Sequence, residues 1–225
     1  MKNKIIEKSL LQANKIMLFV IPTLLLISFL LTFQNNTLSE FLFIGIPAAL
    51  IPMALIKYNP LNNMTRYSVA ISFMTFAALH IHQMQGMIEM HFGIFVLLAF
   101  LSVYKDWITN IIGAAFIAVH HLGFFYLQSS GTPIFVMEGT NLSFSLILIH
   151  AAYVVAETII LCVVTYNAKR EQEVNADIQN AIDLTIKANG NISLGNKCKI
   201  EKVEITQKFN VLIDILSETT NSIKT

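Results

Sequence analysis

The sequence is poor in charge and in cysteine. Asp, Glu, Lys and Arg make up 13% of the 225 residues, whereas hydrophobic residues make up 55%. A soluble domain of this length needs more charged surface, so the composition excludes an ordinary soluble protein and predicts one that crosses a membrane several times. The net charge of +1 argues against nucleic-acid binding. The two cysteines, Cys162 in an apolar run and Cys198 in a polar one, predict no disulfide framework.

Six apolar runs, each near the ~20 residues that a helix needs to cross a bilayer, dominate the sequence. They cover about 16–33, 41–56, 64–82, 87–104, 107–127 and 142–166. No small-residue cleavage pattern follows the first run, so we expect a retained helix rather than a signal peptide. The predicted fold class is all-α: a lead-in over 1–15, a six-helix transmembrane bundle over 16–166, and a helix–connector–helix tail over 167–225.

The basic residues predict the orientation of this bundle. All fifteen Lys and Arg lie in the lead-in, in the loops near residues 57–66 and 105, and in the tail. The other three loops contain none, and each carries a single glutamate: Glu40, Glu89 and Glu138. Because basic loops stay in the cytoplasm, we expect both termini on the cytoplasmic side of a bacterial inner membrane.

Residues able to carry chemistry concentrate near the opposite side of the membrane. Residues 80–91 (HIHQMQGMIEMH) join the third and fourth runs and contain three His, three Met and one Glu. In the predicted orientation all six histidines fall in the outer half of the bilayer, in a layer ~10 Å deep to which four helices contribute. They are His80, His82, His91, His120, His121 and His150. Ionisable groups inside spanning segments are costly and therefore usually functional.

Neutral imidazole is the commonest metal ligand, so this layer predicts a cofactor site. Residues one or two apart do not share a helix face, so at most one of His80 and His82, and one of His120 and His121, faces a common point. Four ligands from four helices suit a bis-histidine haem b or a tetragonal or tetrahedral metal. The alternative is that each ring hydrogen-bonds a neighbouring helix.

Thioethers and carboxylates extend the candidate set. Met84, Met87 and Met90 are soft ligands that favour copper over zinc, for which the sequence has no CxxC or HExxH motif. In the alternative interpretation these methionines are packing residues. Glu89 and Glu157 are candidates for outer partners of the ligands, Glu157 because it lies two turns after the last histidine. The predicted metal ligands are His80, His91, His120, His121, His150, Met84, Met87 and Met90, with His82 added for a cofactor such as haem.

The composition changes at residue 167. The tail contains eight basic and eight acidic side chains, so we expect it to be soluble. A helix is predicted over 168–188, the sequence Asn-Gly-Asn at 189–191 breaks it, and a second helix follows. Apolar residues of that helix recur in the 4-3-4 spacing of a coiled-coil seam: Ile205, Phe209, Leu212, Leu216, Thr219 and Ile223. The tail therefore predicts a homodimer, and either a signal relay or a simple stalk.

Parts of the sequence resemble a known family. Segments 86–100 (GMIEMHFGIFVLLAF), 104–107 (YKDW), 118–128 (AVHHLGFFYLQ) and 150–158 (HAAYVVAET) are similar to the multi-span input region of bacterial methyl-accepting chemotaxis receptors, over about residues 64–166. The tail, with ANGNIS at 188–193 and FN at 209–210, resembles their HAMP relay module, although its connector departs from the usual pattern. The resemblance implies a sensor that acts on a cytoplasmic chemotaxis-type kinase complex. The methylated hairpin of such receptors is missing, so we expect a truncated receptor or a separate sensory subunit.

These patterns predict a membrane sensor without catalytic residues. Its histidine layer would bind metal or haem, or respond to redox state or pH, and the sixth helix would pass the signal to the tail. The alternative is a membrane metal- or haem-dependent oxidoreductase or hydrolase in which Glu157 is the acid or base. A transporter would show inverted repeats with broken helices, for which only Pro47 and Pro52 give a hint.

Overall fold

The computed structural model describes residues 2–139, 142–186, 193–194, 196–200 and 203–224. Within these ranges the chain forms helices and no β-strand, so the predicted all-helical class is confirmed. The chain divides into two compact units. One is Leu10–Tyr166, and the other combines Met1–Ser9 with Asn167–Thr225.

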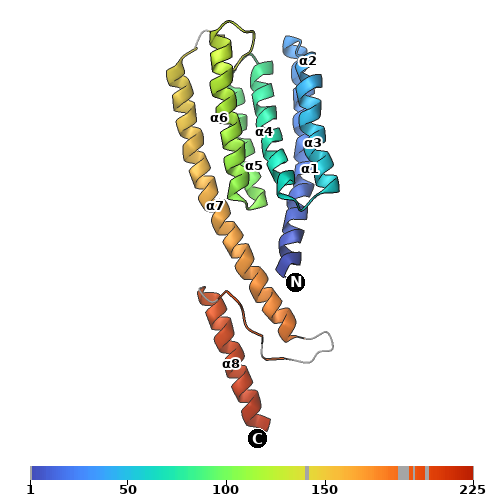
Figure 1. Ribbon diagram of the computed structural model, residues 1–225, viewed down its shortest axis with the longest axis vertical. Coiled ribbons are helices and arrows are strands. Elements are labelled where there is room, and N and C mark those ends of the chain that lie inside the picture. The colour runs from blue at the N-terminus through green and yellow to red at the C-terminus, as the bar shows by residue number, and fades with distance from the viewer. Residues whose placement is uncertain (1, 140–141, 187–192, 195, 201–202, 225) are drawn as a thin grey trace. The chain divides into compact units, whose positions relative to one another are not determined.

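The helices follow the predicted apolar runs closely in the middle of the chain (Figure 1). They are α1 (Lys2–Asn35), α2 (Leu38–Glu40), the π-helical turn η1 (Phe41–Gly45), α3 (Ile46–Tyr58), α4 (Asn63–Gln83), α5 (Ile88–Leu101), the 3-10 turn η2 (Ser102–Tyr104), α6 (Trp107–Ser129), α7 (Phe144–Thr185) and α8 (Glu204–Lys224). α1 is longer than expected because it includes the lead-in, which has good helix formers and no interrupting proline or glycine. α7 joins the predicted span over 142–166 and the predicted helix over 168–188 in one helix without a break.

Among the described residues, four segments are long and apolar enough to cross a membrane: Lys4–Asn35, Leu38–Tyr58, Trp107–Ser129 and Phe144–Thr185. Ile88–Tyr104 is apolar but shorter. α4, the expected third span, is less apolar than these. It packs against α3, α5 and α6, and thirteen of its 21 residues are buried. Polar side chains of α4 such as Ser72 and Gln83 hydrogen-bond neighbouring helices, which compensates for their burial. The bundle of six spans stays a prediction.

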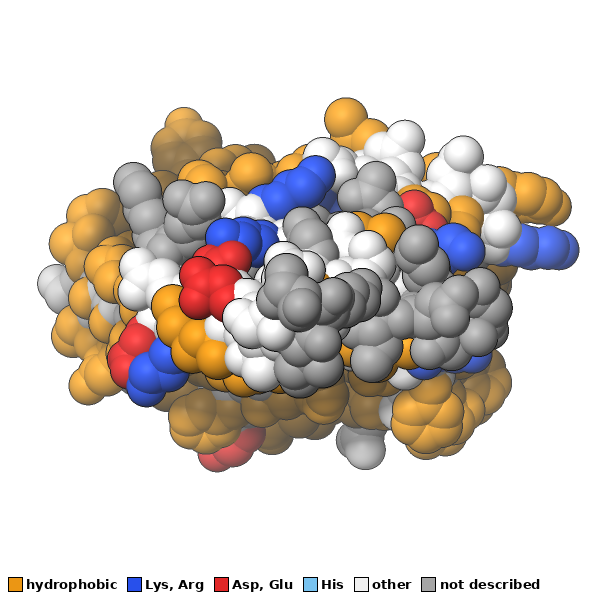
Figure 2. Space-filling model, turned by 90° about the horizontal axis from the view of Figure 1, so that it is seen from below, with side chains coloured by type: hydrophobic (Ala, Val, Ile, Leu, Met, Phe, Trp, Pro, Cys, Tyr) orange, Lys and Arg blue, Asp and Glu red, His pale blue; other side chains and the backbone are white. Residues whose placement is uncertain are grey.

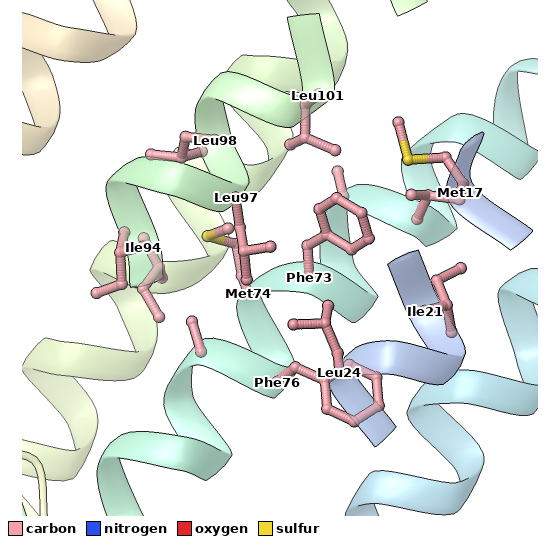
Figure 3. Packing of buried hydrophobic residues seen from close by; sticks show 14 of the residues in the cluster. Met17, Ile21, Leu24, Phe73, Met74, Phe76, Ile94, Leu97, Leu98 and Leu101 are labelled. Atoms are coloured by element: carbon pink, nitrogen blue, oxygen red, sulfur yellow. The ribbon is translucent and has the colours of Figure 1, made fainter. Parts of the chain in front are cut away.

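The hydrophobic core of the unit Leu10–Tyr166 is built around α4 (Figure 3). Figure 3 shows side chains of α4 near those of α1 and α5: Phe73, Met74 and Phe76 with Met17, Ile21, Leu24, Ile94, Leu97, Leu98 and Leu101. Close packing of such side chains gains dispersion energy over many atom contacts. Gly113 brings α6 close to this core, since a Cβ at that position would lie 3.0 Å from Cδ1 of Leu101.

Polar clusters fix both ends of α4. At its C-terminal end the fully buried Gln83 accepts a hydrogen bond from Ser28 Oγ at 3.0 Å and donates from Nε2 to Ser28 O at 3.0 Å. Near its N-terminal end Arg66 Nε donates to Asp106 Oδ2 at 2.6 Å. Thr109 Oγ1 donates to the same oxygen at 2.9 Å. Buried polar groups that have partners favour one arrangement of the helices over others.

In the unit that contains 167–225, the segment before α8 connects two helices. Asp177 of α7 accepts hydrogen bonds at Oδ2 from the backbone N–H groups of Lys199 and Ile200, at 2.7 and 2.8 Å. Asn210 of α8 bonds both backbone groups of Cys198: Oδ1 accepts from N at 2.7 Å and Nδ2 donates to O at 3.2 Å. α7 and α8 are therefore linked through residues 198–200. The predicted break at 189–191 lies outside the described residues.

α8 buries a different face from its predicted seam. Ile213 and Thr206 are buried against its own unit. The seam residues Ile205, Leu212 and Leu216 are 57%, 51% and 43% exposed. These three seam residues are thus accessible to another chain.

Charged side chains of both signs lie near one another on the face shown in Figure 2. Lys197 Nζ is 2.7 Å from Asp214 Oδ2, and Lys208 Nζ is 2.6 Å from Glu204 Oε1. All four side chains are exposed, so water screens both pairs and they add little to stability.

Candidate functional site

Three of the six histidines form one cluster. His91 of α5, His121 of α6 and His150 of α7 are its members, and we call them the histidine cluster. The ring centroid of His91 lies 5.5 Å from that of His121 and 5.3 Å from that of His150. His120 lies beside it, 5.5 Å from the ring of His121, but packs on Phe124 at 3.9 Å. Three helices thus meet through imidazoles.

His80 and His82 bond other parts of the fold. His80 Nε2 lies 3.3 Å from the carbonyl oxygen of Leu24 in α1. His82 Nδ1 accepts a hydrogen bond from the backbone N–H of Phe135 at 3.1 Å, and the two rings stack with centroids 5.8 Å apart. His82 Nε2 is 3.9 Å from Glu40 Oε1. These two rings therefore hold α1 and the loop after α6 against α4.

The predicted thioether ligands lie in the turn between α4 and α5 and in the first turn of α5. Met84 follows the last residue of α4, and Met90 packs against the hydrophobic core. Met87 precedes α5, and its carbonyl oxygen lies 3.2 Å from His91 Nδ1. The backbone of Met87 contacts the cluster in this way, whereas copper binding by the three sulfur atoms stays a prediction.

The two predicted carboxylates have different settings. Glu89 is exposed in the first turn of α5. Glu157 has a buried Oε2 without a hydrogen-bond partner among the described residues. It lies between Val154 and Leu161 on α7, both of which pack against the core. Within the described part of the chain, no group of three or more His, Cys, Asp or Glu is arranged to hold a metal ion.

Backbone carbonyls fix the tautomers of two cluster histidines. His121 Nδ1 is 3.1 Å from Ile117 O, and His150 Nδ1 is 2.7 Å from Leu146 O. A carbonyl oxygen only accepts, so each Nδ1 carries the hydrogen and donates it. Nε2 of each ring is then left with a lone pair. His121 Nε2 is buried and has no hydrogen-bond partner among the described residues.

His91 is held by two carbonyls at once. Nδ1 lies 3.2 Å from Met87 O, and Nε2 lies 3.0 Å from Val136 O. A neutral imidazole has one N–H and donates to only one of these oxygens, whereas an imidazolium donates to both. Protonation of His91 would therefore strengthen its hold on the loop after α6.

A cavity of about 690 Å³ lies between α5, α6 and α7, with the histidine cluster at one end. Its other polar lining residues include Thr158 and Cys162, and none of the described lining residues is Asp, Glu, Lys or Arg. Its α7 wall runs from Ile147 to Val163, which is about 24 Å at ~1.5 Å per residue. The site is thus a long apolar space with imidazoles near one end.

The loop after α6 is tied down beside the cluster. Gln128 Nε2 donates to Met137 O at 2.7 Å, and Gln128 Oε1 accepts from the backbone N–H of Val136 at 2.9 Å. Gly86 lies so close that a Cβ there would be 2.2 Å from the carbonyl carbon of Met137. Gln128 is absent from the residues predicted for the site, because a glutamine at the end of an apolar run resembles an ordinary interfacial residue.

Comparison with protein-family models, with curated proteins and with solved structures finds no match to this chain. The resemblance to chemotaxis receptors and to the HAMP module therefore stays a prediction, and the function has to be argued from the site.

Proposed function

We propose that this chain is a membrane signal-transduction sensor in which occupation of the cavity between α5, α6 and α7 moves α7. The observation that carries the proposal is the double role of α7. It supplies His150 and one wall of the cavity, and it runs as a single helix from Phe144 to Thr185 into the charged part of the chain. A shift of α7 at the cavity is then a shift of the helix that enters the unit containing Asn167–Thr225, which we call the polar unit.

The packing of α7 supports this role. Between residues 144 and 166 only Ile147 and Thr165 are buried. By contrast, most residues of α4 are buried. A helix with few buried contacts is displaced at a lower cost in free energy than one in the core. A ligand with different affinity for two positions of α7 would shift the population between them.

The polar unit offers a path for the signal. Asp177, on the same helix as His150, holds the backbone of residues 199–200, and Asn210 of α8 holds Cys198. A shift of α7 would reach α8 through these bonds. The exposed seam of α8 supports a homodimer, in which two copies would present α8 to a cytoplasmic partner such as a kinase complex.

The histidine cluster is the ligand-binding end of this proposal. His121 and His150 each donate Nδ1–H to a carbonyl, which leaves the lone pair of Nε2 for a ligand. His91 adds a group whose contacts depend on protonation. The proposed membrane is the bacterial inner membrane, with both termini on its cytoplasmic side. An oxidoreductase or hydrolase remains the alternative, with Glu157 as its acid or base.

The relay is testable without knowledge of the ligand. Ala118 lines the cavity, so Ala118→Trp fills part of it, whereas the neighbouring Val119 is 72% exposed and lies outside the lining, which makes Val119→Trp the matched control. Both variants would be made in the full chain with Cys162→Ala and placed in lipid nanodiscs. Cys198, buried in the polar unit, is then the reporter thiol.

We expect Ala118→Trp to change the rate of Cys198 alkylation by N-ethylmaleimide several-fold, and Val119→Trp to leave it unchanged. Ala151→Phe fills the cavity from the α7 side and should act in the same direction as Ala118→Trp. If folded cavity-filling variants and the control react at one rate, the relay is wrong.

A further inference from the structure

We propose that the cavity binds an apolar small molecule whose polar end donates a hydrogen bond, of the quinol or phenol class, with His121 Nε2 as the acceptor. This assignment rests on the proposed function for the site and adds the chemical class of its ligand. Three features of the cavity support it: the hydrogen-bond donors and acceptors of its lining residues, its volume, and its lack of charged lining residues.

The free polar atom at the histidine end is an acceptor. His121 is 9% exposed, it lines the cavity, and its Nε2 has no partner among the described residues. Because Nδ1–H donates to Ile117 O, Nε2 carries a lone pair and no hydrogen. A buried acceptor without a donor carries an uncompensated desolvation cost. A ligand that donates an O–H or N–H to it removes this cost and therefore binds more tightly.

The other polar groups around the cavity donate their hydrogens to backbone carbonyls. His150 Nδ1 donates to Leu146 O, and Thr158 Oγ1 donates to Val154 O at 2.6 Å. Cys162 Sγ donates to Trp107 O at 3.7 Å. The neutral ring of His91 has one N–H, which it directs to one of two carbonyls. His150, Thr158 and Cys162 are left with lone pairs, whereas both nitrogens of His91 face carbonyl oxygens. None of the four has a hydrogen free for a ligand, and so the site favours ligands that donate.

Volume and charge narrow the class further. About 690 Å³ lies within the ~300–1,000 Å³ typical of small-molecule sites. The described lining residues include no Lys or Arg, so nothing there would pair with phosphates, with carboxylates or with the propionates of haem. A bare metal ion finds no group of three ligands in the described residues. A neutral, largely apolar ring with a hydroxyl fits all of these features.

The free acceptor at His121 Nε2 distinguishes two redox states of one molecule. A quinol carries hydroxyl groups and donates to His121 Nε2, whereas the corresponding quinone carries carbonyl oxygens, which only accept. The quinone would place an oxygen lone pair against a nitrogen lone pair. The cavity would therefore bind the reduced form more tightly than the oxidised form, which makes occupancy a measure of the redox state of an apolar pool.

The test compares three probes of one shape: duroquinol, its dimethyl ether, and duroquinone. Full-length protein in nanodiscs is equilibrated by dialysis against each probe under nitrogen, and binding to empty nanodiscs is subtracted. We expect duroquinol to bind about tenfold or more tightly than the other two, since one hydrogen bond to a buried acceptor is at stake. Equal binding of duroquinol and its ether overturns the assignment and indicates ordinary apolar filling, as by lipid chains.

Two variants locate the effect. His121→Phe keeps an aromatic ring of similar size and should reduce duroquinol binding to the level of the ether. His120→Phe changes the adjacent histidine, which does not line the cavity, and should keep the preference for duroquinol. A preference that persists in His121→Phe overturns the assignment. If His121→Phe does not fold, the comparison of the three probes on the natural chain still decides.

The outcomes separate this inference from the function on which it rests. A chain that passes the Ala118→Trp relay test but binds duroquinol no better than its ether remains a sensor with a different ligand. A chain that prefers duroquinol but shows no relay to Cys198 has the predicted site without the signalling role.

Discussion

The side chain of Gln128 and the backbone of Met137 bond each other in both directions. Nε2 of Gln128 donates to Met137 O at 2.7 Å, and Oε1 of Gln128 accepts from Met137 N at 3.1 Å. The same Oε1 accepts from Val136 N at 2.9 Å. The amide of Gln128 thus holds the residue whose carbonyl oxygen contacts His91 Nε2. The position of the histidine cluster thus depends on a residue with no chemistry of its own.

Gln128→Leu should destabilise the protein by about 3 kcal/mol, because it leaves buried backbone groups of residues 136 and 137 without partners. The measurement is the free energy of unfolding in mixed micelles of rising SDS content. Ser129→Ala is the matched control: its exposed hydroxyl bonds only Phe125 O, and its removal should change stability by less than about 0.5 kcal/mol. Equal losses in the two variants would contradict the role of Gln128.

Arg66→Met should cost about 3–5 kcal/mol, because it leaves the buried carboxylate of Asp106 without its cation. The double variant Arg66→Met with Asp106→Leu should be more stable than Arg66→Met alone, since it removes the stranded charge as well. The same unfolding measurement decides. Simple addition of the two single losses would mean that the pair is not coupled.

Gly86→Ala tests the close approach of two loops. Gly86 has φ of +83°, and a Cβ would meet the carbonyl carbon of Met137 at 2.2 Å, so we expect a loss of about 2–4 kcal/mol. Gly93→Ala is the control. A Cβ there meets nothing within 4 Å, and an alanine inside α5 should stabilise by about 0.5–1 kcal/mol. Stabilisation in both variants would refute the contact.

The alkylation of Cys198 should depend on pH. Burial, and then the negative charge of Asp177, raise the pKa of this thiol above the usual 9.0. The thiolate is the reactive form, so the rate should still be rising with pH where a free cysteine has reached its plateau. Asp177→Asn removes the charge and should shift the profile to lower pH. The readout is the rate with N-ethylmaleimide in the Cys162→Ala chain, and a profile like that of free cysteine would contradict the prediction.

The seam of α8 should be the dimer contact. In a chain whose native cysteines are replaced by Ala, Leu212→Cys should form an intermolecular disulfide under mild oxidation in nanodiscs. Val211→Cys is equally exposed but lies off the seam, and should cross-link several-fold less. Equal cross-linking at both positions would argue against a coiled-coil pairing.

The pattern of apolar and polar residues predicted helix ends well where polar residues flank an apolar run. α4 begins at Asn63 and ends at Gln83, each within one residue of the predicted run 64–82. α6 begins at Trp107, as predicted. Helices were predicted on both sides of residue 167, over 142–166 and 168–188, and in the structure they form the single helix α7, which ends at Thr185. A change from apolar to charged composition marks a change of surroundings, and the helix itself continues wherever the residues favour it.

The candidate site was only partly accessible to sequence reasoning. Helical spacing shows that His120 and His121 face different directions, and in the structure His121 lines the cavity. Spacing does not show that His82 bonds Phe135, 53 residues away, or that His80 bonds Leu24, 56 residues away. Such partners are set by the packing of distant segments, which a local pattern does not contain.

The enclosed position of α4 depends on polar contacts with helices that precede it in the chain. Ser72 Oγ donates to Ala48 O of α3 at 2.6 Å, and Gln83 is bonded to Ser28 of α1, so α4 brings polar groups that hydrocarbon would leave unpaired. Both partners precede α4 in the chain and are synthesised first. The partners that satisfy the polar groups of α4 therefore lie in α1 and α3, the helices that precede it along the chain.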